Sequence, residues 1–276
     1  MMEKTKITFI GCGNMGRSLI GGLINYGFPR DHICGTDIDP KQRELTVSRF
    51  GIEVLDNNEQ AIENTDVVVL GVKPQTIKTT LQPLRAVLAR TKPLLLSIAA
   101  GIRLGDLARW SGDELAIVRI MPNTPALVST GATALCANNY VNTTQHDIAE
   151  TIMRSVGITI WVENEELIDA VTALSGSGPA YYFYFMENME KAGIELGLTQ
   201  EQSRLLTLQT ALGAAKMALE SNDDPEILRK QVTSPGGTTE QAVNTMQKNK
   251  LDKIISEAVH AAFNRAQELA KILGKE

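Results

Sequence analysis

Residues 6–37 constrain the fold of this chain more than any other stretch. The apolar run "KITFI" passes directly into "GCGNMG", which is followed by the helix-like "RSLIGGLINYG" and by a second apolar run that ends at Asp37. Gly11, Gly13 and Gly16 match the GxGxxG pattern, and an acidic residue about 20 residues further on completes the signature of a dinucleotide-binding βαβ unit. A glycine-rich turn without a ligand is the alternative, but the strand, helix and acid around the loop favour a nucleotide site.

Strand-like and helix-like segments alternate along the first 162 residues, which predicts an α/β fold with a parallel, doubly wound sheet. The strands in this prediction are buried apolar runs, each ended by glycine, proline or a polar residue. They cover residues 6–11, 32–37, 66–72, 93–101, 115–122 and 158–163.

The amino-acid composition of the sequence changes after Glu163. Runs of Val and Ile give way to Ala, Leu, Met and Gln with apolar residues three and four positions apart, which is typical of helices. Thr199 and Gln202 form a capping-box signature, and Pro179 fits a first helical turn. We therefore expect a dinucleotide-binding domain over residues 1–162 and an all-helical domain over residues 163–276.

Three further segments follow expected strands and should meet the glycine loop at the carboxyl edge of the sheet, where open α/β sheets bind ligands. They are "VKP" with Lys73, "SIAAG" with Ala100, and "RIMPNTP" with Asn123. The small residues of the second segment leave room for a flat ring against the backbone. Together the segments predict a nicotinamide pocket, although strand termination alone explains each of them separately.

Charge and cysteine content exclude several classes of protein. Lys and Arg total 27 against 32 Asp and Glu, a net charge of -5 without a basic block, which argues against nucleic acid or an anionic membrane as partner. The first residues lack the apolar segment of a signal peptide, and three widely spaced cysteines predict reduced thiols in a cytoplasmic protein. The histidines, His32, His146 and His260, have no metal-binding spacing, so no metal is expected.

Six motifs occur in order over nearly the whole chain: "GCGNMG", "VKP", "SIAAG", "RIMPNTPA", "SGSGPAY" and "SPGGTT". In this order they resemble the motifs of the pyrroline-5-carboxylate reductase family. The resemblance implies reduction of the cyclic imine 1-pyrroline-5-carboxylate to L-proline by NADPH or NADH, the last step of proline biosynthesis. It also implies a Rossmann domain and a helical domain that interlocks with a second subunit, in a homodimer that often joins a larger ring.

The motif "SPGGTT" breaks the helical pattern and restarts it at once. Gly236 and Gly237 let backbone N–H groups point outward, and Thr238 is expected to cap the new helix with Gln241 as its capping-box partner. A helix N-terminus attracts an anion, and in the family this loop holds the substrate carboxylate. The resemblance places Thr239 beside the imine and makes it the candidate catalytic residue. An ordinary capped helix start explains Thr238 but not the two glycines before it.

Other site residues follow from the resemblance. Ser177 shapes the substrate pocket, Glu165 faces the substrate nitrogen, and Asn58 and Gln231 contact the cofactor. The remaining cofactor-binding residues come from the glycine loop and the strand ends: Gly11, Cys12, Gly13, Asn14, Met15, Gly16, Thr36, Asp37, Val72, Lys73, Pro74, Ala100 and Asn123.

Asp37 bears on the choice between the two cofactors. Its carboxylate is placed to hydrogen-bond the ribose 2′-hydroxyl of NADH and to repel the 2′-phosphate of NADPH. Thr36, Lys41 and Arg43 lie close enough in sequence to offset that repulsion. We expect both cofactors to be used, with NADH favoured more than is usual in the family.

Two other functions remain open. A hydroxyacid dehydrogenase built from a Rossmann and a helical domain needs a Lys or His as acid or base, and Lys191, Lys216 and His260 are available, but none lies in a glycine-rich motif. A cofactor-binding regulatory protein would keep the glycine loop and have no need of "SPGGTT". Imine reduction fits this sequence better, because the cofactor supplies the hydride and the protein has only to align the reactants and exclude water.

Overall fold

The computed structural model describes residues 4–112 and 114–275, and contacts divide the chain into two compact units. Unit 1 comprises Met1–Ser177 together with Ala262–Glu276, and unit 2 comprises Gly178–Ala261. The chain thus leaves unit 1 once and returns to it at the end.

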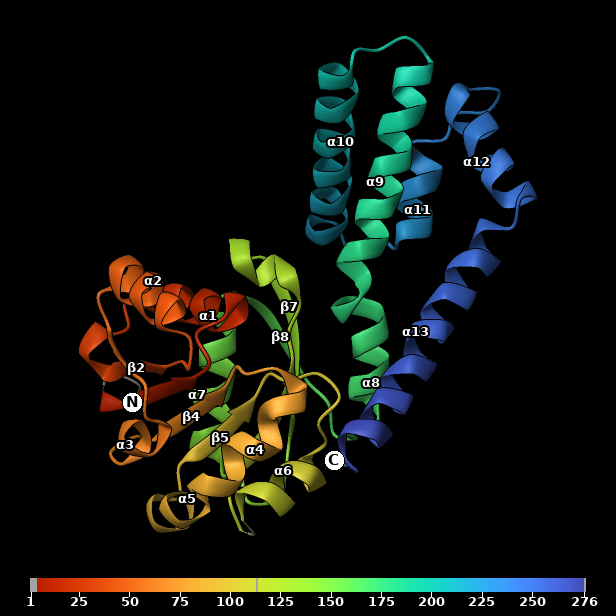
Figure 1. Ribbon diagram of the computed structural model, residues 1–276. Coiled ribbons are helices and arrows are strands. Elements are labelled where there is room, and N and C mark those ends of the chain that lie inside the picture. The colour runs from red at the N-terminus through yellow and green to blue at the C-terminus, as the bar shows by residue number, and fades with distance from the viewer. Residues whose placement is uncertain (1–3, 113, 276) are drawn as a thin grey trace. The chain divides into compact units, whose positions relative to one another are not determined.

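Unit 1 is built on one sheet of eight strands in the order β3-β2-β1-β4-β5-β6-β7-β8 (Figure 1). Consecutive strands fan out from β1 in one direction to β2 and β3, and in the other direction from β4 onward. This reversal beside β1 creates a crevice at the carboxyl ends of the strands, the usual ligand site of such sheets. The strands are β1 (Ile7–Ile10), β2 (Ile33–Thr36), β3 (Glu53–Leu55), β4 (Val67–Leu70), β5 (Leu94–Ser97), β6 (Ile117–Met121), β7 (Gly131–Ala137) and β8 (Gly157–Trp161).

Strands β3 and β7 were missed by sequence reasoning, and β7 is an exception in the expected parallel, doubly wound sheet. It runs antiparallel to β6, while the other neighbouring pairs are parallel. The link from β6 to β7 holds only the short 3-10 helix η5 (Thr124–Val128). A parallel return needs a crossover of about a dozen residues or more, so the short link imposes an antiparallel strand.

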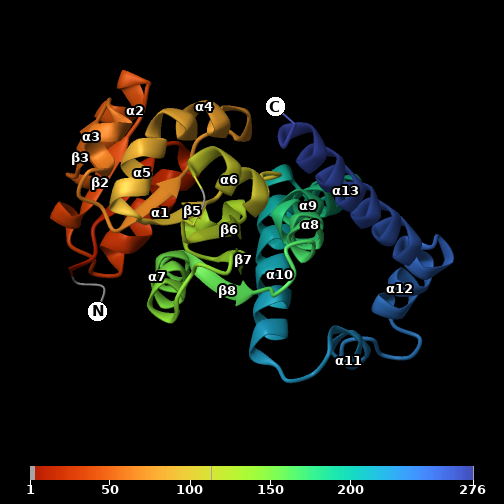
Figure 2. The same ribbon diagram turned by 90° about the horizontal axis from the view of Figure 1, so that it is seen from below.

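Helices cover both faces of the sheet (Figures 1 and 2). The central strands β1, β4 and β5 are buried along their whole length, which explains why they read as continuous apolar runs in the sequence. Leu19 and Ile152 belong to the core of one face, and Ile77 and Trp110 to that of the other. The first face carries α1 (Asn14–Asn25), α2 (Pro40–Phe50) and α7 (Thr143–Arg154), and the second α3 (Asn58–Ile62), α4 (Ile77–Leu81), α5 (Arg85–Thr91) and α6 (Leu104–Ser111).

The contacts do not divide the chain at residue 163, where the composition changes. Helix α8 (Leu167–Val171) packs Ile168 against Ala134 and Cys136 of β7, so it belongs to unit 1. The last helix, α13 (Leu251–Leu273), brings Leu273 back into the core of unit 1. The change in composition after Glu163 therefore marks the end of the last strand, and the compact units part between Ser177 and Gly178.

Unit 2 is wholly helical where it is described. Its longest pair, α9 and α10, packs side by side, with Ser203 of α10 donating to the carbonyl of Glu190 in α9. Thr199 and Gln202 form the expected capping box, which confirms that prediction. No helix among the described residues is long and apolar enough to cross a bilayer. The helices are α9 (Gly178–Glu195), α10 (Gln200–Glu220), α11 (Pro225–Gln231), α12 (Thr238–Lys248) and the first part of α13.

Candidate functional site

The glycine loop between β1 and α1 has the close backbone approach that the sequence predicts. A Cβ on Gly11 would lie 2.8 Å from backbone atoms of Gly71 and Val72, and one on Gly16 would lie 2.5 Å from the Gly11 carbonyl oxygen. Gly11 also has a φ of +97°. Both positions therefore require glycine. A Cβ on Gly13 meets no atom within 4 Å, so the loop is open on that side.

The open side of the loop coincides with the start of helix α1. Gly13 is the N-cap, and no side chain caps the helix. The N–H groups of the first turn have no partner within the helix, and the helix dipole adds positive potential there. A pyrophosphate group fits this start, because backbone donors face an open space that a side chain at Gly13 would fill.

The carboxyl end of β2 is tied to the glycine loop. The Cys12 N–H donates to Asp37 Oδ2 at 2.9 Å, and the Asp39 N–H donates to Asp37 Oδ1 at 2.9 Å. Thr36 donates to Asn58 Oδ1 at 2.6 Å, which brings together two residues predicted to contact the cofactor. Asp37 thus holds the loop against β2 as well as lying where the adenosine ribose of a dinucleotide would bind.

The remaining expected cofactor residues of unit 1 lie along the same edge of the sheet. Lys73 follows β4 and is exposed, and Ala100 follows β5. Asn123 follows β6, and both ends of its amide are bonded: Oδ1 accepts from the Ala132 N–H at 2.9 Å and Nδ2 donates to the Ser175 carbonyl at 3.1 Å. Their roles toward a cofactor stay predictions, but the sheet brings all of them to one edge.

A buried charge network on β6 was missed by sequence reasoning. Arg119 is 2% exposed, and its guanidinium donates to Glu165 Oε1 at 3.0 Å and to Asp169 Oδ1 at 3.1 Å. Glu165 Oε1 also accepts the Leu104 N–H at 2.7 Å. Glu165, predicted to face the substrate nitrogen, is therefore already engaged in anchoring α8 to the sheet. The sequence offered one signal for this network, the single arginine Arg119 within the apolar strand β6.

A π-helix, Thr172–Gly176, follows α8 and leads to Ser177. Single turns of π-helix are rare and occur often at functional sites. A Cβ on Gly176 would lie 2.4 Å from Met121 Cε, so the turn packs against the end of β6. The backbone N–H of Ser177 donates to the Thr172 carbonyl at 2.8 Å. The motif "SGSG" is thus fixed on the same side of the sheet as Asn123.

In unit 2 the loop before α12 is built differently from the expectation. Gly237, and not Thr238, is the N-cap, and no side chain caps the helix, so the predicted capping box is wrong. Gly236 has a φ of +72°, and its N–H donates to Glu240 Oε2 at 2.8 Å. Glu240 instead stabilises the turn through this hydrogen bond. Thr239 is exposed.

Gln231, a predicted cofactor contact, lies at the end of α11 in unit 2. Its side-chain amide donates to Asp223 Oδ2 at 2.9 Å. Its role toward the cofactor stays a prediction.

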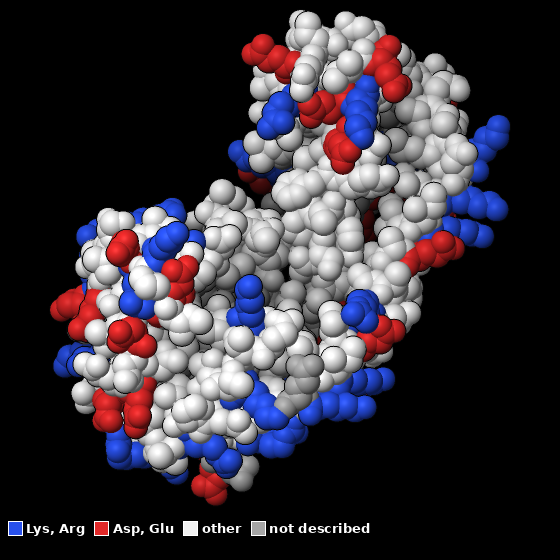
Figure 3. Space-filling view, viewed as in Figure 1, with Lys and Arg blue, Asp and Glu red and all other residues white. Residues whose placement is uncertain are grey.

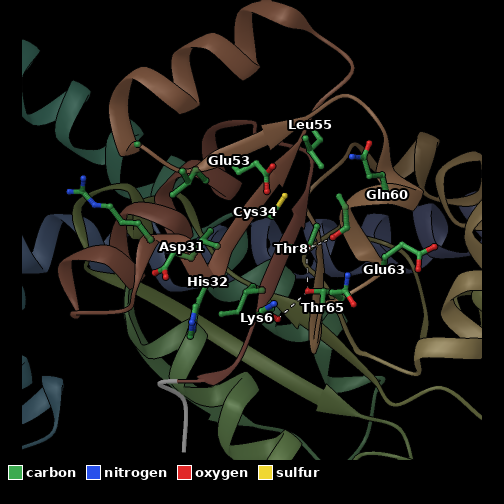
Figure 4. A pocket seen from close by; sticks show the side chains of 17 residues that line it. Lys6, Thr8, Asp31, His32, Cys34, Glu53, Leu55, Gln60, Glu63 and Thr65 are labelled. Carbon is green, nitrogen blue, oxygen red and sulfur yellow. Dashed lines mark hydrogen bonds between the residues drawn. The ribbon is translucent and has the colours of Figure 1, made fainter.

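A cavity of about 800 Å³ lies at the amino ends of β1, β2 and β3, away from the carboxyl edge that carries the glycine loop (Figure 4). Cys34 and Glu53, paired residues on β2 and β3, line it together with Thr8, which donates to Thr65 Oγ1 at 3.1 Å. Burial, and then the charge of Glu53, raises the pKa of the Cys34 thiol to about 12. A raised pKa favours the protonated thiol at neutral pH, the less reactive form. None of the predicted site residues lines this cavity.

Two models of known protein families match separate parts of the chain. The family model described as pyrroline-5-carboxylate reductase dimerisation matches residues 165–269. The model described as NADP oxidoreductase, coenzyme F420-dependent, matches residues 6–101, which include the glycine loop. The first match begins close to the change in composition after Glu163.

Individual relatives extend the similarity to the whole chain. A pyrroline-5-carboxylate reductase of Pseudomonas aeruginosa is 47% identical over 274 residues, covering 99% of this chain and 100% of the relative. One from Arabidopsis thaliana is 37% identical over 270 residues, covering 98% and 97%.

Solved structures agree. The pyrroline-5-carboxylate reductase of Coxiella burnetii is 46% identical with a TM-score of 0.92, covering 96% of this chain and 98% of that one. The Plasmodium falciparum pyrroline carboxylate reductase with NADP bound is 32% identical with a TM-score of 0.87, covering 98% and 100%. Prephenate dehydrogenase of Aquifex aeolicus, 16% identical with a TM-score of 0.56, shares only the fold. Identity this high over the full length means that the chain belongs to the pyrroline-5-carboxylate reductase family.

Proposed function

We propose that this protein reduces 1-pyrroline-5-carboxylate to L-proline with NADPH or NADH, as the last step of proline biosynthesis. One observation carries the proposal. This chain, which belongs to the family, has both the open nucleotide loop at Gly13 and the uncapped helix start at Gly237. The loop suits a dinucleotide pyrophosphate, and the helix start suits the carboxylate of a small substrate.

When bound, the reduced nicotinamide cofactor supplies the hydride that adds to the carbon of the imine. The residues of the chain bind and orient it. The first-turn N–H groups of α1 hold the pyrophosphate beside Gly13, and Asp37 and Asn58 lie at the ribose end. Val72 and Ala100, at the ends of β4 and β5, line the nicotinamide side. Because the hydride comes from the cofactor, the protein has only to align the two reactants and exclude water.

The substrate is held by α12 in this mechanism. The free N–H groups of Thr238 and Thr239 at the helix start receive the carboxylate. The Thr239 hydroxyl is exposed and makes no hydrogen bond within the described part of the chain, so it is free to bond the ring nitrogen. Ser177, which follows the π-helix of unit 1, is a further residue proposed to contact the substrate. A protonated imine is the more electrophilic form, and a hydrogen bond at its nitrogen fixes the carbon toward the hydride.

The three residues considered as acid or base for a hydroxyacid dehydrogenase do not favour that alternative. Lys191 is exposed and bonded to Glu187, and that hydrogen bond raises its pKa, the opposite of what a lysine base needs. Lys216 is paired with Glu220 at 3.7 Å on the surface of α10. His260 Nδ1 lies 2.8 Å from the Ser256 carbonyl of its own helix. None of the three lies in a glycine-rich site motif.

We also propose that the protein works as a homodimer, and that a ring of dimers forms from it. The observation in favour is that unit 2 leaves large apolar side chains uncovered: Tyr182, Leu205 and Leu212 are 69%, 67% and 63% exposed. Much of the face of unit 2 in Figure 3 carries no charged side chain. Surfaces of this kind are usually interfaces. In this arrangement each active site is completed by both subunits.

We propose a cytoplasmic location as well. It is supported by the three free cysteines, of which Cys12 and Cys136 are buried and none is in a disulfide.

An assay of the purified full-length protein tests the activity. Absorbance of NADPH or NADH is followed after mixing with 1-pyrroline-5-carboxylate, and in parallel with a panel of 2-keto acids. We expect oxidation of one cofactor for each proline formed and no turnover of the keto acids. Turnover of a keto acid instead would favour the hydroxyacid dehydrogenase, and cofactor binding without any turnover would favour a regulatory protein.

A further inference from the structure

Arg17 lies directly after the third glycine of the loop and belongs to none of the motifs that identify the site. Its Nη1 donates to the Cys12 carbonyl at 2.6 Å and also contacts Gln42 Oε1 at the start of α2. Its Nη2 donates to Asn14 Oδ1 at 2.9 Å. The guanidinium therefore bridges the glycine loop and the helix that follows β2.

All of these partners are neutral. Some other arginines of unit 1 pair with carboxylates, as Arg90 does with Glu63 at 2.7 Å and Arg119 with Asp169 at 3.1 Å. Among the described residues Arg30, Arg49 and Arg85 have no such pair. Arg17 has no carboxylate oxygen within 4.0 Å among the residues that the structure describes, and neither has Arg43. Two positive charges without an ionic partner thus lie near the carboxyl end of β2.

Arg43 and Asp37 complete the arrangement. Arg43 Nη1 donates to the Asp37 carbonyl at 2.8 Å, so it lies at the same strand end. The two carboxylate oxygens of Asp37 each accept a backbone N–H, from Cys12 and from Asp39. The backbone of Cys12 links Arg17 to Asp37, because the Cys12 N–H donates to Asp37 and the Cys12 carbonyl accepts from Arg17.

Two carboxylates lie at this strand end: Asp37, whose oxygens accept two backbone N–H groups, and Asp39, which accepts the Lys41 N–H. The two guanidinium groups near them have only neutral partners, so they remain available to pair with an anion. A phosphate dianion gains charge-assisted hydrogen bonds from guanidinium groups, which suit its oxygens better than any other side chain. Such bonds would oppose the repulsion expected from Asp37.

We propose that Arg17, with Arg43 beside it, is the residue that lets this chain bind the 2′-phosphate of NADPH despite Asp37. The assignment rests on the proposed function only in taking NADP(H) as a cofactor. It replaces the expectation that NADH is favoured, because that expectation considered the flexible Lys41 and Arg43 and did not include a cation fixed on the glycine loop.

Binding of nucleotide fragments to the full-length protein tests the assignment without turnover. Titration calorimetry with 2′,5′-ADP and with 5′-AMP isolates the contribution of the 2′-phosphate. In the wild type we expect 2′,5′-ADP to bind more tightly than 5′-AMP. Arg17→Gln should weaken 2′,5′-ADP by roughly tenfold or more and change 5′-AMP by less than about twofold. The matched control Arg49→Gln removes a charge from α2 near Phe50 and should leave both affinities unchanged.

Two further variants separate charge from structure. Arg17→Lys should keep part of the preference for 2′,5′-ADP, and added salt should reduce that preference in the wild type. Asp37→Asn keeps an acceptor for the Cys12 N–H and removes the charge, so it should strengthen 2′,5′-ADP by about tenfold. Equal losses of both nucleotides in Arg17→Gln, or no loss of either, would overturn the assignment.

The outcome is independent of the reductase reaction. A protein that binds 2′,5′-ADP through Arg17 but does not reduce 1-pyrroline-5-carboxylate would contradict the proposed function and leave the assignment standing. The reverse case is a protein that reduces the imine with NADH and NADPH alike while its Arg17→Gln variant binds both fragments like the wild type. That result would support the proposed function and contradict the assignment of Arg17.

Discussion

At the scale of single residues, the proposed chemistry depends most on the Thr239 hydroxyl at the exposed start of α12. Thr239→Val keeps the volume and removes the hydrogen bond to the ring nitrogen. A hydrogen bond to a charged group contributes about 1.5–3 kcal/mol, so kcat/KM should fall by roughly tenfold to more than a hundredfold. Steady-state kinetics with 1-pyrroline-5-carboxylate measure this. Thr239→Ser should restore most of the activity, and unchanged kinetics for Thr239→Val would remove the hydroxyl from the mechanism.

The cysteines make a second prediction at this scale. Burial, then the charge of Asp37, raises the pKa of the Cys12 thiol from 9.0 to about 11, and burial raises that of Cys34 to about 12. A pKa raised by folding means that the folded state holds the proton more tightly than the unfolded state. The resulting stability is complete below about pH 9 and is lost as the pH rises toward 11 and 12.

Two measurements check the cysteine prediction. At pH 8 a thiol reagent should modify the folded protein slowly and the protein in denaturant quickly. The free energy of unfolding should decline above about pH 9, and Cys34→Ala should make that decline less steep. Rapid modification of Cys34 in the folded protein at pH 8 would contradict the raised pKa.

At the scale of elements, the network of Arg119, Glu165 and Asp169 fixes α8 on β6. The side chains of Arg119 and Asp169 are 3% and 2% exposed. Asp169→Ala removes one of the two carboxylates bonded to buried Arg119 and leaves Glu165 as the other, so it should lower the free energy of unfolding by about 1.5–3 kcal/mol, the contribution of a hydrogen bond between charged groups. Urea denaturation of the full chain measures the difference.

The pair of Arg90 and Glu63 supplies the matched control. Its side chains are 61% and 45% exposed, with a similar separation of 2.7 Å. Solvent screens this pair, so Glu63→Ala should change stability by less than about 1 kcal/mol. A loss for Asp169→Ala as small as that for Glu63→Ala would show that the network does not anchor α8.

At the scale of the whole molecule, assembly depends on the apolar surface of unit 2. Leu205 and Leu212 lie seven residues apart on α10, on one face of the helix, and both are more than half exposed. Replacing both by Asp places charge in the proposed dimer interface. We expect a monomer with little activity, because each proposed active site needs both subunits.

Sedimentation velocity of the double variant measures the assembly, and the assay with 1-pyrroline-5-carboxylate measures the activity. The control Lys216→Gln changes an exposed residue of the same helix and should remain a fully active dimer. A double variant that is monomeric and fully active would contradict the proposal that the sites are shared.

The sequence by itself determined the parts of this protein that local rules specify. The GxGxxG loop between a strand and a helix, the buried runs of β1, β4 and β5, and the capping box at Thr199 depend on neighbours a few residues apart. Steric limits on backbone angles and the periodicity of apolar residues act over that range. The motifs also identified the family, and the proposed activity with it.

Tertiary structure decided which distant groups meet. Arg119 is separated by 46 and 50 residues from its partners Glu165 and Asp169, and Cys12 by 25 residues from Asp37. The antiparallel direction of β7 follows from the short link between β6 and β7, and the periodicity of apolar residues does not predict the path of that link. Charges and hydrogen-bond donors do not specify their partners along a chain, because their energies depend on distance and burial that exist only after the sheet has formed.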